Sequence, residues 1–304
     1  GEMRHHTRPR RCGGFVFVVS AMLLASCGVQ RDISFVVIVK SSNYAQDSEG
    51  QLTLLNYHFF SEIFLQPGGE VVSAALVRAT APTKRMEYES RGDNYYFEGG
   101  HFNSVEEADQ AYPNGSYVLS LETPTLSLSE FELALEGPGG VTDIPDPIRI
   151  SLWQDEEEVH PLSVDPETEL VVRWSAYSNG VADPRGIVDD MIFLVLADCH
   201  GERILHTGLP FQGDYTTFRT TEMRVEAGKL RTGHTYSGFV EFPHVVDSKI
   251  EQAVPGFTSY ATATYLDLQT TGQSTIESCP DAPPPMDTGQ TDRMDSTAAQ
   301  GNRL

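Results

Sequence analysis

Residue types that could carry out chemistry are present in this sequence, but few of them have the spacing that a known reaction requires. Cys199, His200 and His206 are types that bind zinc, yet their spacing matches no standard zinc pattern. The sequence contains no Gly-x-Ser-x-Gly motif, no His-Glu-x-x-His motif and no glycine-rich phosphate loop. We therefore expect no catalytic residue, no bound metal and no cofactor.

Clustered carboxylates allow two further interpretations. Neighbouring acids such as Asp189-Asp190 point to opposite sides of a strand, so they do not face each other across a cleft as a glycosidase pair does. Asp143 and Asp146, with the run Asp155–Glu158, offer the oxygen atoms that Ca²⁺ prefers, but the Asp-x-Asp-x-Asp-Gly pattern is missing. A solvated acidic surface is the favoured interpretation of this run, and calcium binding is the alternative.

Two aromatic clusters could present rings to a sugar. They are Tyr57-His58-Phe59-Phe60 and Tyr95-Tyr96-Phe97. Side chains alternate between the two faces of a strand, so half of each cluster should face the core. Core packing is the default expectation, and a sugar-binding platform is the alternative.

The N-terminal segment has the layout of an export signal. Arg4, Arg8, Arg10 and Arg11 precede a short apolar run from Phe15 to Ala25. A helix that crosses a bilayer needs about 20 residues, so this run predicts a removable signal rather than a permanent membrane span.

The end of that segment, Leu24-Ala25-Ser26-Cys27, resembles the lipobox of bacterial lipoprotein precursors. The resemblance implies that residues 1–26 are removed and that Cys27 carries lipid, which ties the protein to a membrane of the cell envelope. In that family the residue after the cysteine influences sorting, and Gly28 favours the outer membrane. An ordinary cleaved signal, which leaves a secreted protein, is the alternative.

Charge and cysteine content narrow the possible partners. The chain of 304 residues has a formal charge of −22, and loss of residues 1–26 makes it more acidic. Such a surface repels nucleic acid, whose binding requires Lys and Arg.

After export and lipidation, the free cysteines that remain are Cys199 and Cys279. An oxidising compartment permits a disulfide between them. Two separate thiols are the alternative.

Short alternating apolar runs predict an all-β protein of two tandem antiparallel β-sandwiches. The first module spans residues 31–140, a Pro- and Gly-rich linker covers 141–147, and the second module spans 148–278. Ser104-Val105-Glu106-Glu107 is a capping box, which predicts one short helix over Val105–Ala111. The tail 279–304 is polar and Pro-rich and is expected to be disordered.

The second module carries the pattern Leu230-x-x-Gly233-x-x-Tyr236 before an alternating strand. This resembles the tyrosine corner of fibronectin type III and other immunoglobulin-like sandwiches, in which a Tyr hydroxyl bonds to nearby backbone. The resemblance implies that two long loops, Ser175–Asp190 and Pro243–Tyr260, lie at one end of the sandwich. The candidate binding residues on these loops are Tyr177, Asp183, Arg185, Asp189, His244 and Asp247.

These observations favour a non-catalytic, lipid-anchored envelope protein that acts as a binding, adhesion or architectural module. Its expected partners are the membrane, through the N-terminal lipid, and a protein or glycan ligand. A carbohydrate-binding accessory protein and an enzyme with an unrecognised site are the two alternatives.

Overall fold

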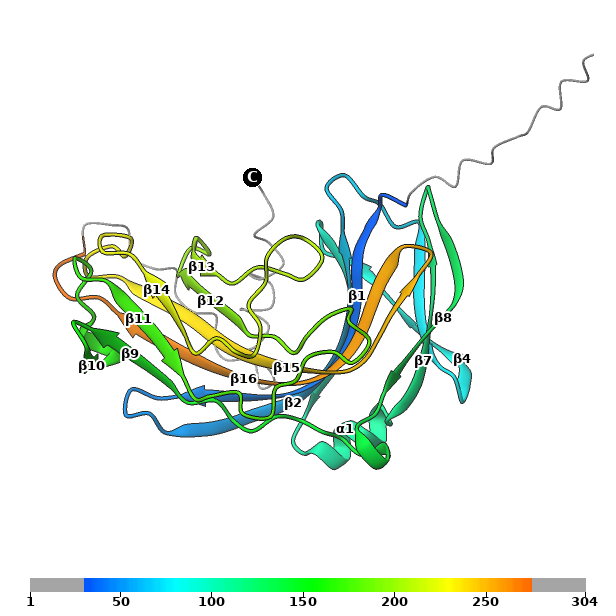
Figure 1. The fold of residues 1–304 in the computed structure, drawn as a ribbon, viewed down its shortest axis with the longest axis horizontal. Coiled ribbons are helices and arrows are strands. Elements are labelled where there is room, and N and C mark those ends of the chain that lie inside the picture. Colours follow the sequence, from blue (N-terminus) through cyan, green and yellow to red (C-terminus); the bar gives the residue numbers. More distant parts are fainter. Residues whose placement is uncertain (1–29, 275–304) are drawn as a thin grey trace, which may run out of the picture.

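The computed structural model describes residues 30–274, and these residues form an all-β fold with one short α-helix (Figure 1). The predicted fold class is therefore confirmed. In chain order the elements are β1 (Ile33–Gln46), β2 (Leu52–Leu65), β3 (Ser73–Arg78), β4 (Ala81–Glu87), β5 (Glu89–Ser90), β6 (Asn94–Phe102), α1 (Val105–Ala111), β7 (Gly115–Glu122), β8 (Ser127–Leu135), β9 (Ile150–Gln154), β10 (Glu157–Val159), β11 (Leu170–Trp174), β12 (Phe193–Asp198), β13 (Arg203–His206), β14 (Glu222–Val225), β15 (Thr235–Glu251) and β16 (Val254–Gln269).

The strands form three sheets. An eight-stranded sheet has the order β13-β12-β15-β16-β1-β2-β6-β5, and two four-stranded sheets have the orders β4-β3-β7-β8 and β10-β9-β11-β14. The long strands β1, β2, β15 and β16 form the centre of the large sheet. β1 and β16 run parallel, with Val36 opposite Gly256 and Gln46 opposite Leu266, so the N-terminal and C-terminal halves of the chain share one sheet.

Both small sheets pack on the same face of the large sheet. Val254 and Tyr260 of β16 belong to the core beneath β3, β7 and β8, while Leu266 and Leu268 belong to the core beneath β9, β11 and β14. All four positions are even, and alternate residues of a strand share a face. One curved sheet therefore serves as the common layer of two sandwiches, at opposite ends of its long strands (Figure 1).

The odd positions of β1 and β16 point to the other face, which we call the pocket face. Phe35, Val37 and Val39 of β1 lie there with Phe257 and Ala261 of β16. The segments around Val188 and Leu209 cover part of this face and form a third apolar cluster. The pocket face is therefore partly covered by connecting chain rather than by a sheet.

The one helix agrees with its predicted bounds, and its cap explains why it forms. The Ser104 hydroxyl accepts a hydrogen bond from the backbone N–H of Glu107 at 3.2 Å, and the Glu107 carboxylate accepts one from the N–H of Asn103 at 3.0 Å. Backbone donors in the first turn and just before the helix thus find acceptors in side chains.

The segment predicted as the loop Pro243–Tyr260 is instead a long hairpin, which corrects that prediction. β15 continues through Pro243, which lies opposite Ala261, and the hairpin turns only at Gln252 and Ala253, both with positive φ. Pro243 and Gly256 normally mark breaks in a strand. Here packing requires a glycine at position 256, because a Cβ at this position would lie 2.6 Å from the Phe131 ring.

Several predicted features fall outside the described residues. They are the signal 1–26, the lipobox with Cys27, the cysteine Cys279 and the tail beyond residue 278. The predicted linker 141–147 contains no strand, although the eight-stranded sheet joins the two modules on either side of it. No helix between residues 30 and 274 has the length and hydropathy that a membrane crossing requires.

Candidate functional site

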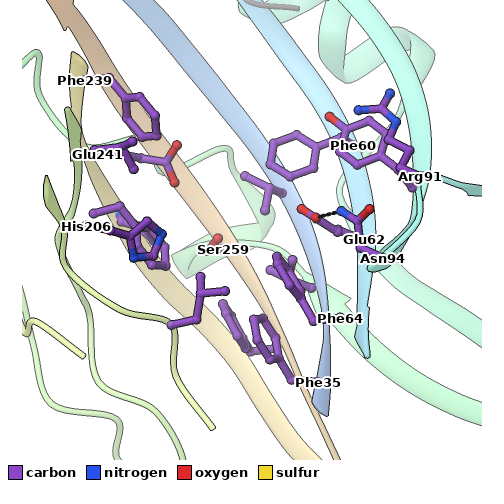
Figure 2. A pocket seen from close by; sticks show the side chains of 18 residues that line it. Phe35, Phe60, Glu62, Phe64, Arg91, Asn94, His206, Phe239, Glu241 and Ser259 are labelled. Atoms are coloured by element: carbon purple, nitrogen blue, oxygen red, sulfur yellow. Dashed lines mark hydrogen bonds between the residues drawn. The ribbon is translucent and has the colours of Figure 1, made fainter. Parts of the chain in front are cut away.

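The strongest candidate site is a cavity on the pocket face. It has a volume of about 110 Å³ and is lined by side chains from both halves of the chain (Figure 2). The lining residues are Phe35, Val37, Val39, Phe60, Glu62, Phe64, Arg91, Asn94, Tyr96, Phe193, Val195, His206, Leu209, Phe239, Glu241, Pro243, Phe257 and Ser259. Figure 2 shows Glu241 and His206 on one side of the cavity, and Phe60, Glu62 and Arg91 on the other.

Strong curvature of the large sheet creates this cavity. β6 and β13 are six strand spacings apart, which is about 29 Å in a flat sheet. Yet Asn94 of β6 and His206 of β13 line the same cavity, and both also line an adjoining polar cavity of about 200 Å³. The sheet is therefore curled towards a half-barrel, and the interior of a barrel is a common place for a ligand.

Strand alternation decides which aromatic side chains reach the cavity. Phe60, Glu62 and Phe64 of β2 line it, whereas Phe59 and Ile63, at odd positions of the same strand, belong to the core of the first sandwich. The sequence-based expectation that half of each aromatic cluster faces the core agrees with this arrangement.

The rings that line the cavity are stacked in two groups. Phe35 stacks on Phe64 with 4.2 Å between ring centroids and 14° between ring planes. Phe60 and Tyr96 lie 5.4 Å apart at 13°, and the Arg91 guanidinium sits 3.7 Å above the centre of the Tyr96 ring. This cation–π contact holds a positive charge at the rim of an aromatic wall.

A few polar groups interrupt the apolar lining. The Asn94 amide donates to the Glu62 carboxylate, and Glu241 lies across the cavity from it (Figure 2). His206 accepts a hydrogen bond through Nδ1 from the backbone N–H of Gly208 at 2.9 Å, so the neutral ring carries its proton on Nε2. Burial and the charge of Arg203 lower the pKa of His206 to about 4, which keeps the ring neutral near pH 7.

This combination is suited to binding rather than to covalent chemistry. Flat rings can pack on an apolar or sugar ring face, and two carboxylates, an amide and an imidazole can satisfy a few hydroxyl or amine groups. The sequence patterns flagged the rings of β2 and β6 but not His206 or Glu241 as pocket residues, because those two reach the cavity only through the curvature of the sheet.

The predicted tyrosine-corner residues lie together at one end of β15. The Tyr236 hydroxyl accepts a hydrogen bond from the backbone N–H of Arg231 at 2.7 Å, and both Leu230 and Tyr236 are buried in the core of the second sandwich. Gly233 has φ +62°, and a Cβ there would lie 2.5 Å from the backbone of Ser274. A similar bond occurs in the first sandwich, where the Tyr117 hydroxyl donates to the Pro113 carbonyl at 2.8 Å.

The predicted binding residues of the loop Ser175–Asp190 and of β15 are brought together, but most of their polar groups are occupied within the protein. Arg185 lies 3.4 Å from Asp183 and 3.3 Å from Asp247, and Asp247 accepts from the backbone of Ala134. Tyr177 is buried and stacks on Phe242 at 4.4 Å.

The remaining two predicted binding residues are also engaged in internal contacts. Asp189 accepts from the Asp183 backbone N–H at 2.9 Å. His244 is bonded to Asp190. These contacts anchor the loop to β15 and leave little free polar surface for a ligand.

Among the described residues, one group of side chains has a composition suited to a metal. His58, Glu98 and His101 place a ligand atom each within 4.8 Å of one another. The two imidazoles, however, are stacked at 4.2 Å with only 12° between their planes, and the Glu98 carboxylate is bonded to His58 at 2.7 Å. A metal lies close to the plane of each imidazole that binds it. Two parallel, stacked rings therefore cannot bind one ion together, and these three side chains do not form a metal site in this arrangement.

Cys199 is disulfide-bonded. Its predicted partner, Cys279, lies outside the described residues, so the pairing stays a prediction. The neighbouring Asp198 accepts from the backbone N–H groups of His200 and Glu202 at 2.9 and 2.8 Å, which forms the turn between β12 and β13. Cys199 is therefore not available as a zinc ligand beside His200 and His206.

No family model matches the chain, and no curated protein matches it. Two solved structures show a distant similarity. One is a structure named "Biofilm associated protein - BSP domain", with 9% identity and a TM-score of 0.19 over 78% of this chain, which spans 30% of that chain. The other is the chicken CNTN1 FN1-FN3 domains, with 11% identity and a TM-score of 0.16 over 71% of this chain and 64% of that one. At these TM-scores neither similarity supports a functional argument.

Proposed function

We propose that this protein is a non-catalytic, lipid-anchored protein of the cell envelope that binds a ligand in the cavity of the pocket face. The observation that supports binding is the cavity itself, in which two stacked ring groups surround a small set of polar side chains. The arginine-rich, apolar N-terminal segment that ends in Leu24-Ala25-Ser26-Cys27 supports export and lipidation, with Gly28 favouring the outer membrane.

Site-specific photo-crosslinking in cells tests the binding proposal. A photoreactive phenylalanine analogue at position 60 is expected to form adducts, because Phe60 lines the cavity. The same analogue at Tyr57, on the same strand but outside the cavity lining, is the matched control. Equal adducts from both positions, or none from position 60, would contradict a ligand site in this cavity.

The lipid anchor has a separate test. Cells that express the full chain are labelled with radioactive palmitate, and the wild-type protein is expected to carry label that the Cys27→Ala variant lacks. Label on both proteins, or on neither, would overturn the anchor without affecting the proposed cavity.

A carbohydrate is the ligand class with a specific observation in its favour. Phe60 and Tyr96 form a nearly parallel pair beside Glu62, Asn94 and Arg91, which places hydrogen-bonding groups around an aromatic wall. Titration with a panel of soluble oligosaccharides is expected to show binding that Phe60→Ala weakens about tenfold, which corresponds to about 1.4 kcal/mol and to one lost aromatic contact. Binding that Tyr57→Ala weakens equally would place the sugar elsewhere.

A further inference from the structure

A polar cluster at one end of the first sandwich has contacts that a simple ion pair does not need. Lys40 of β1 is fully buried on the face opposite the pocket, and its Nζ donates to Asp109 of α1 at 2.6 Å and to the side-chain oxygen of Asn114 at 2.9 Å. Asn114 precedes β7, so the amine and the amide come from the two facing sheets of the sandwich. We propose that Lys40 and Asn114 form an intramolecular isopeptide bond that covalently joins these two layers.

The surroundings of the amide favour attack on its carbonyl carbon. The Asn114 oxygen accepts hydrogen bonds from Lys40 Nζ at 2.9 Å and from the Tyr260 hydroxyl at 2.7 Å. Lys40 and Tyr260 are held side by side because they are direct partners on the paired strands β1 and β16. Nζ itself becomes bonded to Cγ during attack, so the Tyr260 hydroxyl is the donor that polarises the amide and stabilises the negative charge that develops on the oxygen.

A continuous chain of hydrogen bonds connects the nucleophile to the leaving group. The Asn114 Nδ2 donates to the Thr142 hydroxyl at 2.8 Å, and that hydroxyl donates to Asp109 Oδ1 at 2.7 Å. Asp109 Oδ1 is the same oxygen that accepts from Lys40 Nζ. A proton taken from Lys40 by Asp109 can therefore be passed through Thr142 to the nitrogen that departs.

The reaction balances without an oxidant, a reductant or any co-reactant. The lone pair of Nζ forms a bond with Cγ of Asn114, the bond between Cγ and Nδ2 breaks, and Nδ2 leaves as ammonia. Of the three protons on a charged Nζ, one goes to Asp109, one goes to the departing nitrogen, and one stays on the new amide. Asp109 is the general base, and Thr142 relays the proton.

The burial of Lys40 and its position next to Asn114 supply the two remaining requirements of the reaction, a neutral amine and close contact of the reacting groups. Removal from water lowers the pKa of Lys40, although the hydrogen bond to Asp109 partly opposes this, and the neutral amine is the form that attacks. The fold holds the two groups in contact although 74 residues separate them in sequence. Such an intramolecular arrangement raises the effective concentration of the nucleophile far above any free amine.

Peptide mapping of the purified full chain tests the bond directly. A trypsin digest of the denatured protein is expected to contain a branched peptide that joins residues 32–78 to residues 92–149, uncut after Lys40. Its mass equals the sum of the two linear peptides minus one ammonia. Full recovery of a peptide that ends at a cleaved Lys40, together with an unmodified 92–149 peptide, would overturn the proposal without any variant.

Succinimide formation at Asn114-Gly115 also releases ammonia and must be distinguished from the proposed bond. A succinimide leaves Lys40 open to trypsin and is cleaved by hydroxylamine, whereas the isopeptide bond blocks trypsin and resists hydroxylamine. Detection of the succinimide in place of the branched peptide would contradict the proposal.

Variants then assign the roles. Asp109→Asn keeps the size of the side chain, and is expected to leave the chain folded by circular dichroism but to abolish the branched peptide. Thr142→Val is expected to slow its appearance after synthesis. Unchanged branching in Asp109→Asn would overturn the proposed base.

Discussion

The imidazole of His244 lies between two carboxylates, with Nδ1 2.9 Å from Asp190 and Nε2 3.5 Å from Asp143. Asp190 is buried and also accepts hydrogen bonds from the backbone N–H groups of Val245 at 2.7 Å and Val181 at 3.0 Å. This single carboxylate therefore joins the loop Ser175–Asp190 to β15, and the hydrogen bond from His244 offsets part of the cost of burying it.

The hydrogen bond to Asp190 raises the pKa of His244, against the opposing effect of burial. A raised pKa in the folded state means that the folded chain holds this proton more tightly than the unfolded chain. The stabilisation is complete below the ordinary pKa of about 6.5 and is lost as the pH rises through the folded-state value. Urea unfolding between pH 6 and pH 9 should show a falling free energy of unfolding, and His244→Gln should flatten that slope. An unchanged slope in the variant would contradict this assignment.

The contribution of His206 to the free energy of unfolding should depend on pH in the opposite direction. Its pKa is lowered to about 4, so the folded chain resists a proton that the unfolded chain accepts below about pH 6.5. Stability should fall as the pH drops from about 6.5 to about 4, and His206→Gln should remove this part of the acid sensitivity. The same unfolding experiment in mildly acidic buffers checks the prediction, with His160→Gln, a more exposed histidine, as the control. Equal effects of the two substitutions would mean that the burial of His206 is not responsible.

The two tyrosine hydroxyl bonds should contribute to stability by similar amounts. Tyr236→Phe leaves the backbone N–H of Arg231 without its acceptor in a part-buried site, and Tyr117→Phe leaves the Pro113 carbonyl without its donor. Each substitution is expected to lower the free energy of unfolding by about 1–3 kcal/mol, the usual cost of an unsatisfied buried polar group. Tyr57→Phe, on a half-buried ring of β2, should change it by less than about 0.5 kcal/mol. Denaturant titration of the three variants provides the comparison.

Local patterns in the sequence predicted the all-β class and the one α-helix. The bounds expected for α1 agree with the structure, because a capping box is a local signal, as are the alternation and turn residues that indicated β-strands. The parallel pairing of β1 with β16 has no local signal, since it joins residues more than two hundred positions apart. The continuous large sheet and the hairpin through Pro243 could therefore not be predicted from the sequence. At Pro243, tertiary packing overrides the tendency of proline to end a strand.

The same distinction applies to the candidate site. Phe60 and Tyr96 could be flagged from sequence, because clusters of rings are visible there. His206 and Glu241 line the same cavity as Phe60 only because the large sheet curves strongly. Lys40 contacts Asn114 only because two sheets of the first sandwich face each other. The loop residues were selected by an assumed topology, and most of them bond to the protein itself.

Asp183 is one of these loop residues whose polar atoms bond within the protein, and it provides a test of that assignment. Its side chain is fully buried and accepts hydrogen bonds from the backbone N–H groups of Arg185, Ile187 and Val188, and from the Ser248 hydroxyl. These bonds hold its pKa below the ordinary value despite the opposing effect of burial. The resulting stabilisation is present above about pH 4 and is lost as the pH falls through the folded-state pKa.

Asp183→Asn replaces one accepting oxygen with an NH₂ group that faces backbone donors. It should lower the free energy of unfolding by about 2–3 kcal/mol at pH 7, since bonds to a charged acceptor are the stronger ones. Asp155→Asn, in an exposed turn, should have almost no effect. Because Asp183 holds the loop in place rather than lining the cavity, the folded variant should keep its ligand affinity in the assay that separates Phe60→Ala from Tyr57→Ala. A large loss of affinity with unchanged stability would show instead that Asp183 contacts the ligand.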